Sequence, residues 1–175
     1  MFAAHLAAGL ALKARVPKAP AWALLTGAFV PDLVWIGLAR SGVEPTDPKV
    51  FFDDWSHSLA TIIVWACLFA MPFWRWGRAT CIAIWLAVFS HFVLDAPVHP
   101  KPLALFPNAS MRVGWDTWHW GLSPSSLGAS HYWWLQLMVT LVLLTAYVLW
   151  ARRIAQPNLI AASCLLVIGM HLLML

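Results

Sequence analysis

Residues 78–99, RATCIAIWLAVFSHFVLDAPVH, contain the pattern that decides the fold class. The run from Arg78 to Asp95 is apolar and close to the roughly 20 residues that a helix needs to cross a hydrocarbon core. At its end His91, Asp95 and His99 follow at four-residue steps, the spacing of one helix face. Ionisable groups are costly at the margin of a membrane-spanning helix, so we treat these residues as candidates for a functional site.

The composition indicates an integral membrane protein. Of the 175 residues, 62% are hydrophobic and only 10% are charged, and the mean hydropathy is +0.74. The 13 Trp residues are typical of side chains that anchor a protein at the membrane interface. The net charge of +4 comes from scattered basic residues without a nucleic-acid motif, so we expect a membrane lipid and no nucleic acid as partner.

Six apolar segments predict an all-α polytopic membrane helical bundle that forms a single integral membrane domain over residues 1–175. The segments are residues 2–16, 21–39, 55–74, 78–95, 131–150 and 159–175. The first is short: at 1.5 Å per residue it spans about 22 Å, which suits a short span, a re-entrant helix or an interfacial helix. Residues 96–130 form a long loop rich in Pro and Trp, which we expect to be a lid or a substrate wall.

The basic residues indicate an orientation for this bundle. With the loop around Arg75 and Arg78 in the cytoplasm, the cytoplasmic side carries more Lys and Arg than the other side. In this arrangement every acidic residue and all seven histidines lie on or toward the outer side of the membrane. Hydrophobic segments alone would not gather these side chains at one face, and we therefore predict a polar site on the outer side.

Imidazole and carboxylate groups from four segments reach this face. His5 begins the first segment, Asp32 follows Pro31 in the second, and His57 begins the third. Such nitrogen and oxygen ligands suit zinc or a similar divalent metal. A salt bridge or a proton path would also satisfy the two membrane-depth carboxylates. We favour a metal site with an open position, made by His5, Asp32, His57, His91 and Asp95.

Further polar residues near this face are candidates for other roles. Asp53, Asp54 and His99 are predicted to move protons, although the two aspartates would also suit the start of a helix. In WDTWHWG, residues 115–121, Asp116 and His119 are possible additional ligands or parts of an interfacial aromatic belt. Lys101 and Arg112 could hold a substrate phosphate.

The order of the motifs resembles that of a known family. His5, Gly27 with Pro31-Asp32, His57-Ser58 and His91-x3-Asp95 resemble the bacterial inner-membrane family typified by YdjM, described as membrane-bound metal-dependent hydrolases. The resemblance covers about the first hundred residues. The same order is similar to the soluble zinc-dependent phospholipase C and P1 nuclease group, in which clustered zinc ions activate water for phosphoester hydrolysis.

The resemblance implies residue roles and an activity. It implies that one metal is held by Asp32, His57, His91 and Asp95, and that Asp95 bridges to a second metal held partly by His5. YdjM-like proteins often carry His-Arg where this chain has Asp53-Asp54, so a basic partner for phosphate is missing at that place. The expected protein is a multi-pass hydrolase of the bacterial inner membrane with zinc as cofactor. Its expected substrate is a phosphoester such as a lipid head group.

Two other classes use similar residues. A divalent-metal or proton transporter could use the same cluster as a binding station, but it should also carry polar residues in the inner half of the membrane. Here the inner halves of the segments are almost wholly apolar. A haem- or quinone-binding membrane protein could use paired histidines at one depth.

Overall fold

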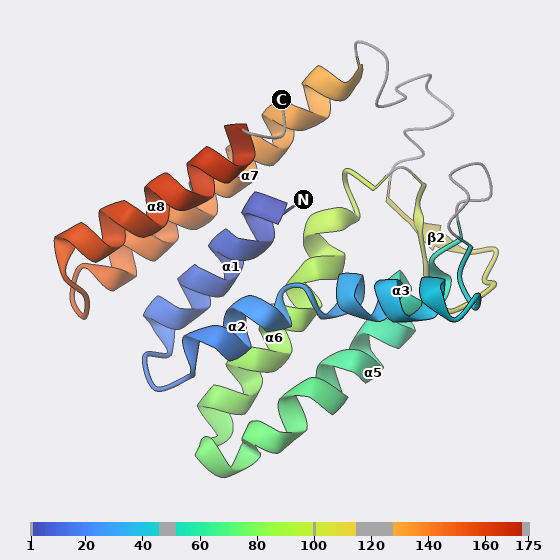
Figure 1. Ribbon diagram of the computed structural model, residues 1–175, viewed down its shortest axis with the longest axis horizontal. Coiled ribbons are helices and arrows are strands. Elements are labelled where there is room, and N and C mark those ends of the chain that lie inside the picture. The colour runs from blue at the N-terminus through green and yellow to red at the C-terminus, as the bar shows by residue number, and fades with distance from the viewer. Residues whose placement is uncertain (1, 46–51, 100, 115–127, 173–175) are drawn as a thin grey trace.

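The computed structural model describes residues 2–45, 52–99, 101–114 and 128–172, and these residues are mostly helical (Figure 1). The helices are α1 (Phe2–Arg15), α2 (Ala21–Gly27), α3 (Val30–Arg40), α4 (Asp54–His57), α5 (Leu59–Ala70), the 3-10 helix η1 (Met71–Trp76), α6 (Arg78–Asp95), α7 (Gly128–Ala151) and α8 (Pro157–Leu172). Two short strands, β1 (Leu103–Ala104) and β2 (Arg112–Val113), pair antiparallel, with Leu103 opposite Val113.

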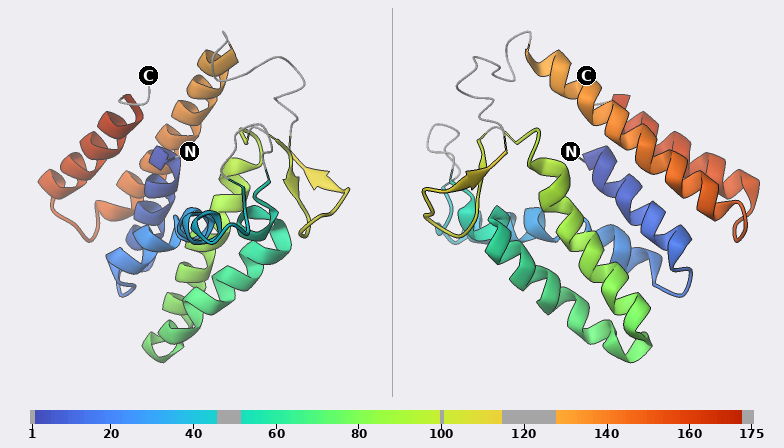
Figure 2. Two further views of the ribbon diagram at one scale, coloured as in Figure 1. Left: turned by 45° about the vertical axis from the view of Figure 1, so that its right-hand side comes forward. Right: turned by 180° about the vertical axis from the view of Figure 1, so that it is seen from behind.

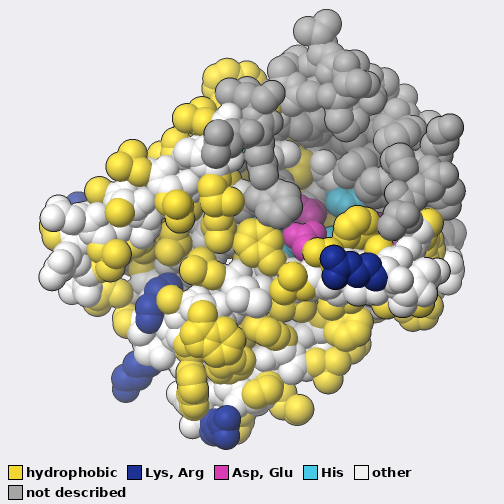
Figure 3. Space-filling view, in the orientation of Figure 1, with side chains coloured by type: hydrophobic (Ala, Val, Ile, Leu, Met, Phe, Trp, Pro, Cys, Tyr) yellow, Lys and Arg dark blue, Asp and Glu magenta, His cyan; other side chains and the backbone are white. Residues whose placement is uncertain are grey.

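Three helical stretches are long and apolar enough to cross a membrane. They are Leu59–Trp76, Arg78–Asp95 and Trp133–Ala151, and the bent pair α2–α3 makes a fourth if it is counted as one span. Large apolar side chains on these stretches are exposed, among them Leu68, Ile82 and Val142. Hydrophobic side chains, coloured yellow, cover much of the face shown in Figure 3. This exposure fits contact with lipid. All six predicted apolar segments contain helix; among the described residues three or four stretches are long enough to be spans, and α1 and α8 are shorter.

The second predicted segment is broken into two helices. α2 ends at Gly27, α3 begins at Val30, and the two axes are bent by 56°. Pro31 lies in the first turn of α3 and explains the break, because proline has no N–H group and its ring clashes with the carbonyl four residues before it. The break leaves Ala28 and Phe29 between the end of α2 and the start of α3, and Figure 1 shows the change of direction between these two helices.

An alanine seam joins α1 to α7. Four alanines of α1 are buried in one core cluster with Leu144, Tyr147 and Ala151 of α7; they are Ala3, Ala7, Ala11 and Ala14. Small side chains allow helix backbones to approach closely, which is a usual way for helices to pack in a membrane. α1 therefore lies between the α7–α8 pair and the group formed by α2, α5 and α6 (Figure 2).

α2 packs closely on α6 at Gly27. A Cβ atom at Gly27 would lie 3.3 Å from the Cβ atom of Ala87 on α6. Beside this contact, Leu24, Ile84 and Phe73 are buried in a wholly apolar cluster. The close approach brings the break between α2 and α3 next to the final turns of α6, where His91 and Asp95 lie.

The predicted loop at 96–130 is partly described. Residues 101–114 contain the β1–β2 hairpin, which contacts the start of α5 through the hydrogen bond from the Ala60 amide to the Leu105 carbonyl. α7 begins at Gly128, so the last three residues of the predicted loop are helical. The prediction that the loop is a lid falls mainly on residues 115–127, which lie outside the described residues.

We predict that Gly114→Ala destabilises the protein more than Gly42→Ala. Both glycines have positive φ angles, +116° and +76°, so an alanine is strained at either position by about 1–2 kcal/mol. At Gly114 the new Cβ atom would also overlap the carbonyl oxygen of Ala96, whereas the space around Gly42 is open. Thermal unfolding in detergent measures the difference. Equal losses in Tm would show that the hairpin does not depend on its contact with the end of α6.

Candidate metal centre

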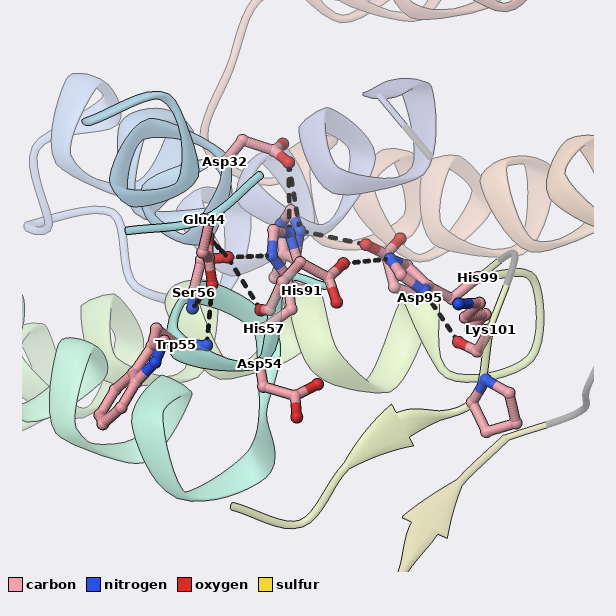
Figure 4. A network of polar contacts seen from close by, with 12 residues as sticks. Asp32, Glu44, Asp54, Trp55, Ser56, His57, His91, Asp95, His99 and Lys101 are labelled. Carbon is pink, nitrogen blue, oxygen red and sulfur yellow. Dashed lines mark hydrogen bonds and ion pairs between the residues drawn. The ribbon is translucent and has the colours of Figure 1, made fainter. Parts of the chain in front are cut away.

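The structure brings five predicted ligands together from four helices (Figure 4). They are His5 near the start of α1, Asp32 in the first turn of α3, His57 at the end of α4, and His91 and Asp95 in the last turns of α6. Two groups of three have ligand atoms close enough to hold an ion: one contains His5, His91 and Asp95, and the other contains Asp32, His57 and His91. His91 belongs to both groups.

Four pairs of ligand atoms in the two groups lie within 3.1–3.7 Å of each other. His91 Nε2 lies 3.1 Å from Asp95 Oδ2 and 3.7 Å from Asp32 Oδ1. His5 Nε2 is 3.2 Å from Asp95 Oδ1, and His57 Nε2 is 3.5 Å from Asp32 Oδ1. Zinc bonds of 2.0–2.2 Å in a tetrahedron place neighbouring ligand atoms about 3.3–3.6 Å apart. The quoted contacts are therefore close to the spacing that zinc ligands have, and each group of three could hold an ion.

The ring of His91 is oriented by the break between α2 and α3. Its Nδ1 atom lies 2.8 Å from the carbonyl oxygen of Ala28. A carbonyl only accepts, so Nδ1 carries the hydrogen, and Nε2 is the ring nitrogen that faces Asp32 and Asp95. Nε2 is buried and makes no hydrogen bond of acceptable geometry with any described residue. An ion at this position would satisfy it.

His5 supports the same interpretation. It is 1% exposed, and neither ring nitrogen makes a hydrogen bond with the described residues. Its ring is stacked on that of His91, with centroids 4.1 Å apart and planes within 8° of parallel. Stacked rings direct their Nε2 atoms toward the same carboxylate, Asp95. Parallel rings 4.1 Å apart leave no space for a haem between them, so His5 and His91 do not form a pair of axial ligands on opposite haem faces.

Asp32 is the most accessible of the five ligands. Its side chain is 33% exposed, whereas the other four residues are buried. Acidic and histidine side chains are visible between apolar ones on the face shown in Figure 3. The cluster is therefore most open to its surroundings at Asp32, while His5, His91 and Asp95 are buried.

Asp53 and His99, both predicted to move protons, form a pair at the edge of the cluster. His99 Nε2 lies 3.0 Å from Asp53 Oδ2, and His99 Nδ1 lies 2.9 Å from the Lys101 carbonyl oxygen. Both nitrogens face acceptors, which favours the imidazolium form. Burial lowers the pKa of His99, but Asp53 outweighs it and the pKa is raised above its ordinary value. Burial raises the pKa of Asp53, but His99 outweighs it and the pKa is lowered.

Asp54 and Arg112 pair with each other. Arg112 Nη1 lies 3.1 Å from Asp54 Oδ1 and Nη2 lies 3.2 Å from Asp54 Oδ2, while the Asn108 amide donates to Oδ2 at 3.0 Å. These contacts tie the hairpin to α4. They favour a structural role for both residues over the predicted proton transfer by Asp54 and the predicted phosphate binding by Arg112.

The remaining predicted residues are less informative. The backbone carbonyl of Lys101 orients His99, which gives this residue a local structural role besides the predicted phosphate contact. Asp116 and His119 lie outside the described residues.

Two contributors were not predicted from the sequence. Glu44 is fully buried and contacts Ser56, which in turn contacts His57 Nδ1. In the sequence Glu44 is an acidic residue in a turn, and nothing in its neighbourhood distinguishes it from an exposed one. The second contributor is the backbone carbonyl of Ala28. In the sequence, only the nearby Pro31 indicated that a helix would be interrupted here and leave this carbonyl available.

Comparisons with protein-family models, with curated proteins and with solved structures give no match.

We predict that Arg112→Gln lowers the free energy of unfolding by about 1.5–3 kcal/mol, the usual contribution of hydrogen bonds to a charged group. Metal content should stay at the wild-type level, because Arg112 contacts Asp54 and not the cluster. Arg40→Gln, at the exposed end of α3, is the control. Thermal unfolding and metal analysis of the purified variants measure both effects. An Arg112→Gln protein of normal stability would instead favour the predicted phosphate-binding role.

We predict that the Asp53–His99 pair stabilises the protein most between about pH 4 and 6.5. The raised pKa of His99 gives stability that is complete below its ordinary value of 6.5 and is lost as the pH rises through the raised value. The lowered pKa of Asp53 gives stability that is present above 3.8 and is lost as the pH falls through the lowered value.

The measurement is the difference in Tm between wild type and Asp53→Asn in detergent with a chelator. We expect a larger difference at about pH 5.5 than at about pH 9. A difference that does not change with pH would contradict the charged pair.

Proposed function

We propose that the protein is a membrane-bound, metal-dependent hydrolase of the bacterial inner membrane. Its cofactor would be a divalent ion of the zinc type, held by His5, Asp32, His57, His91 and Asp95, and its substrate a phosphoester such as a lipid head group. The supporting observation is the convergence of imidazole and carboxylate atoms at 3.1–3.7 Å, with the other nitrogen of His91 already bonded to a backbone carbonyl.

One ion at His91 fits the proposal best. Nδ1 of His91 is engaged by Ala28, so Nε2 can bind one ion only, although both groups of ligands include this atom. A second ion bridged by Asp95, which the family resemblance implies, would have to rest on Asp95 and His5. The 3.2 Å separation of His5 Nε2 from Asp95 Oδ1 is compatible with such an ion.

The residues of the cluster would have different roles in the reaction. A bound zinc-type ion would lower the pKa of a water molecule and stabilise charge on phosphoryl oxygens. Asp32, on the accessible side, would face the substrate, while buried His5 and His91 would exclude bulk water from behind. The His99 ring lies 5.9 Å from that of His57, which makes its imidazolium a candidate donor of a proton to the leaving oxygen.

The position of the cluster favours a substrate at the membrane surface. His91 and Asp95 lie in the final turns of α6, at one end of a candidate span, where lipid head groups are found. The other part of α6 packs on α2 and η1 through apolar side chains, including Leu24, Ile84 and Phe73. A transported ion would need polar groups along its path, so this apolar packing favours hydrolysis over transport.

We predict that wild-type protein purified gently carries at least one divalent ion per chain, and that His91→Ala and Asp95→Asn lose it. Hydrolysis of phosphoester probes, such as bis(p-nitrophenyl) phosphate and short-chain phosphatidic acid, should fall at least about 100-fold in both variants. His171→Ala is the control, because His171 is equally buried but lies on α8, outside the cluster. Elemental analysis and initial rates are the measurements.

Other outcomes would count against the proposal. A wild-type protein that holds no metal and gains none on titration with zinc would overturn it. Metal uptake by liposomes containing the protein, without hydrolysis of any probe, would favour the transporter.

A further inference from the structure

Glu44 is a buried carboxylate that three donors surround. It lies in the turn after α3 and is 0% exposed. Its Oε1 atom accepts from the backbone amides of Trp55 at 2.8 Å and Ser56 at 3.0 Å, and its Oε2 atom accepts from the Ser56 hydroxyl at 2.8 Å (Figure 4). A buried acid is costly unless hydrogen bonds compensate it, so this arrangement needs an explanation.

The Ser56 hydroxyl connects Glu44 to His57. Ser56 Oγ lies 2.7 Å from His57 Nδ1, and it also lies 3.0 Å from the carbonyl oxygen of Asp53. The Ser56 hydroxyl has one hydrogen, and the two acceptors that it can be donated to are the Glu44 carboxylate and the Asp53 carbonyl. With Glu44 in its carboxylate form, the short contact with His57 is satisfied when the ring supplies the other hydrogen, so Nδ1 is the protonated nitrogen.

This protonation decides which atom of His57 faces the cluster. With the hydrogen on Nδ1, the free electron pair of the neutral ring is on Nε2, the atom 3.5 Å from Asp32 Oδ1. We propose that Glu44 and Ser56 are positioning residues, which fix the tautomer and the ring orientation of His57 so that Nε2 is available as a metal ligand.

The inference rests on the proposed metal site and adds a second set of residues to it. His91 is oriented in the same sense by the Ala28 carbonyl, so in both histidines Nδ1 is bonded and Nε2 faces the carboxylates. The two cases differ in chemistry. His57 is held through a hydroxyl by a carboxylate, and a negative charge behind an imidazole also makes it a stronger ligand.

The contacts of Glu44 can be tested separately. Glu44 holds the backbone of α4 through two amides and reaches His57 only through the hydroxyl of Ser56. Ser56→Ala removes the connection to His57 and leaves the amide contacts in place. Ser58→Ala is the matched control, since Ser58 is also 0% exposed and its hydroxyl contacts Thr61 instead. Glu44→Gln removes the charge and preserves the shape, and Ser56→Thr retains the hydroxyl.

The experiment measures zinc affinity by competition with a chelator, and the Tm of the metal-free proteins. We expect Ser56→Ala and Glu44→Gln to bind zinc about 10–100-fold more weakly than wild type, the usual effect of removing a residue that orients a ligand. Ser58→Ala and Ser56→Thr should stay near wild-type affinity. Metal-free Ser56→Ala and Ser58→Ala should have similar Tm values, which separates positioning from general stability.

Two results would overturn the inference, and they can be distinguished. If wild type binds zinc and Ser56→Ala and Glu44→Gln bind it equally well, the positioning role is wrong and the metal site remains. If wild type binds no zinc, the proposed function and this inference fail together.

Discussion

The break in the second apolar segment determines the geometry of the candidate site. Pro31 removes a backbone donor and prevents one straight helix, and the following helix turns by 56°. Two consequences meet at His91: the Ala28 carbonyl is available for its Nδ1 atom, and Asp32 approaches its Nε2 atom. A straight helix would use the carbonyl internally. The break between α2 and α3 therefore orients the ring of His91 and places Asp32 beside it.

The polar groups of the site are arranged by their need for compensation in an apolar molecule. The outer pairs, Asp53 with His99 and Asp54 with Arg112, compensate each other directly. The inner group contains His5 and His91, whose buried Nε2 atoms lie close to Asp95 without hydrogen bonds of acceptable geometry among the described residues. The two imidazole rings therefore share one carboxylate, at 3.2 Å from His5 and 3.1 Å from His91.

Local spacing made part of this structure predictable. The i, i+4 rule placed His91 and Asp95 on one face of α6, and hydrophobic length identified the candidate spans. Hydrophobicity alone does not decide whether α1 and α8 span, because both are apolar but short, at 14 and 16 described residues. Two sets of contacts could not be predicted: the pair of Asp54 with Arg112, and the hydrogen-bonded series from Glu44 through Ser56 to His57. Both involve residues in irregular segments, whose position against the helices does not follow from any periodicity in the sequence.

The alanine seam between α1 and α7 has a consequence for mutational tolerance. Four ligands come from residues 32–95, whereas His5 is carried by a helix whose closest packing is with α7. A larger side chain at Ala7 would push α1 away from α7 and move His5 relative to Asp95, without touching the other ligands. Substitutions along this seam would therefore change the distance between His5 and Asp95 while leaving the other four candidate residues in place.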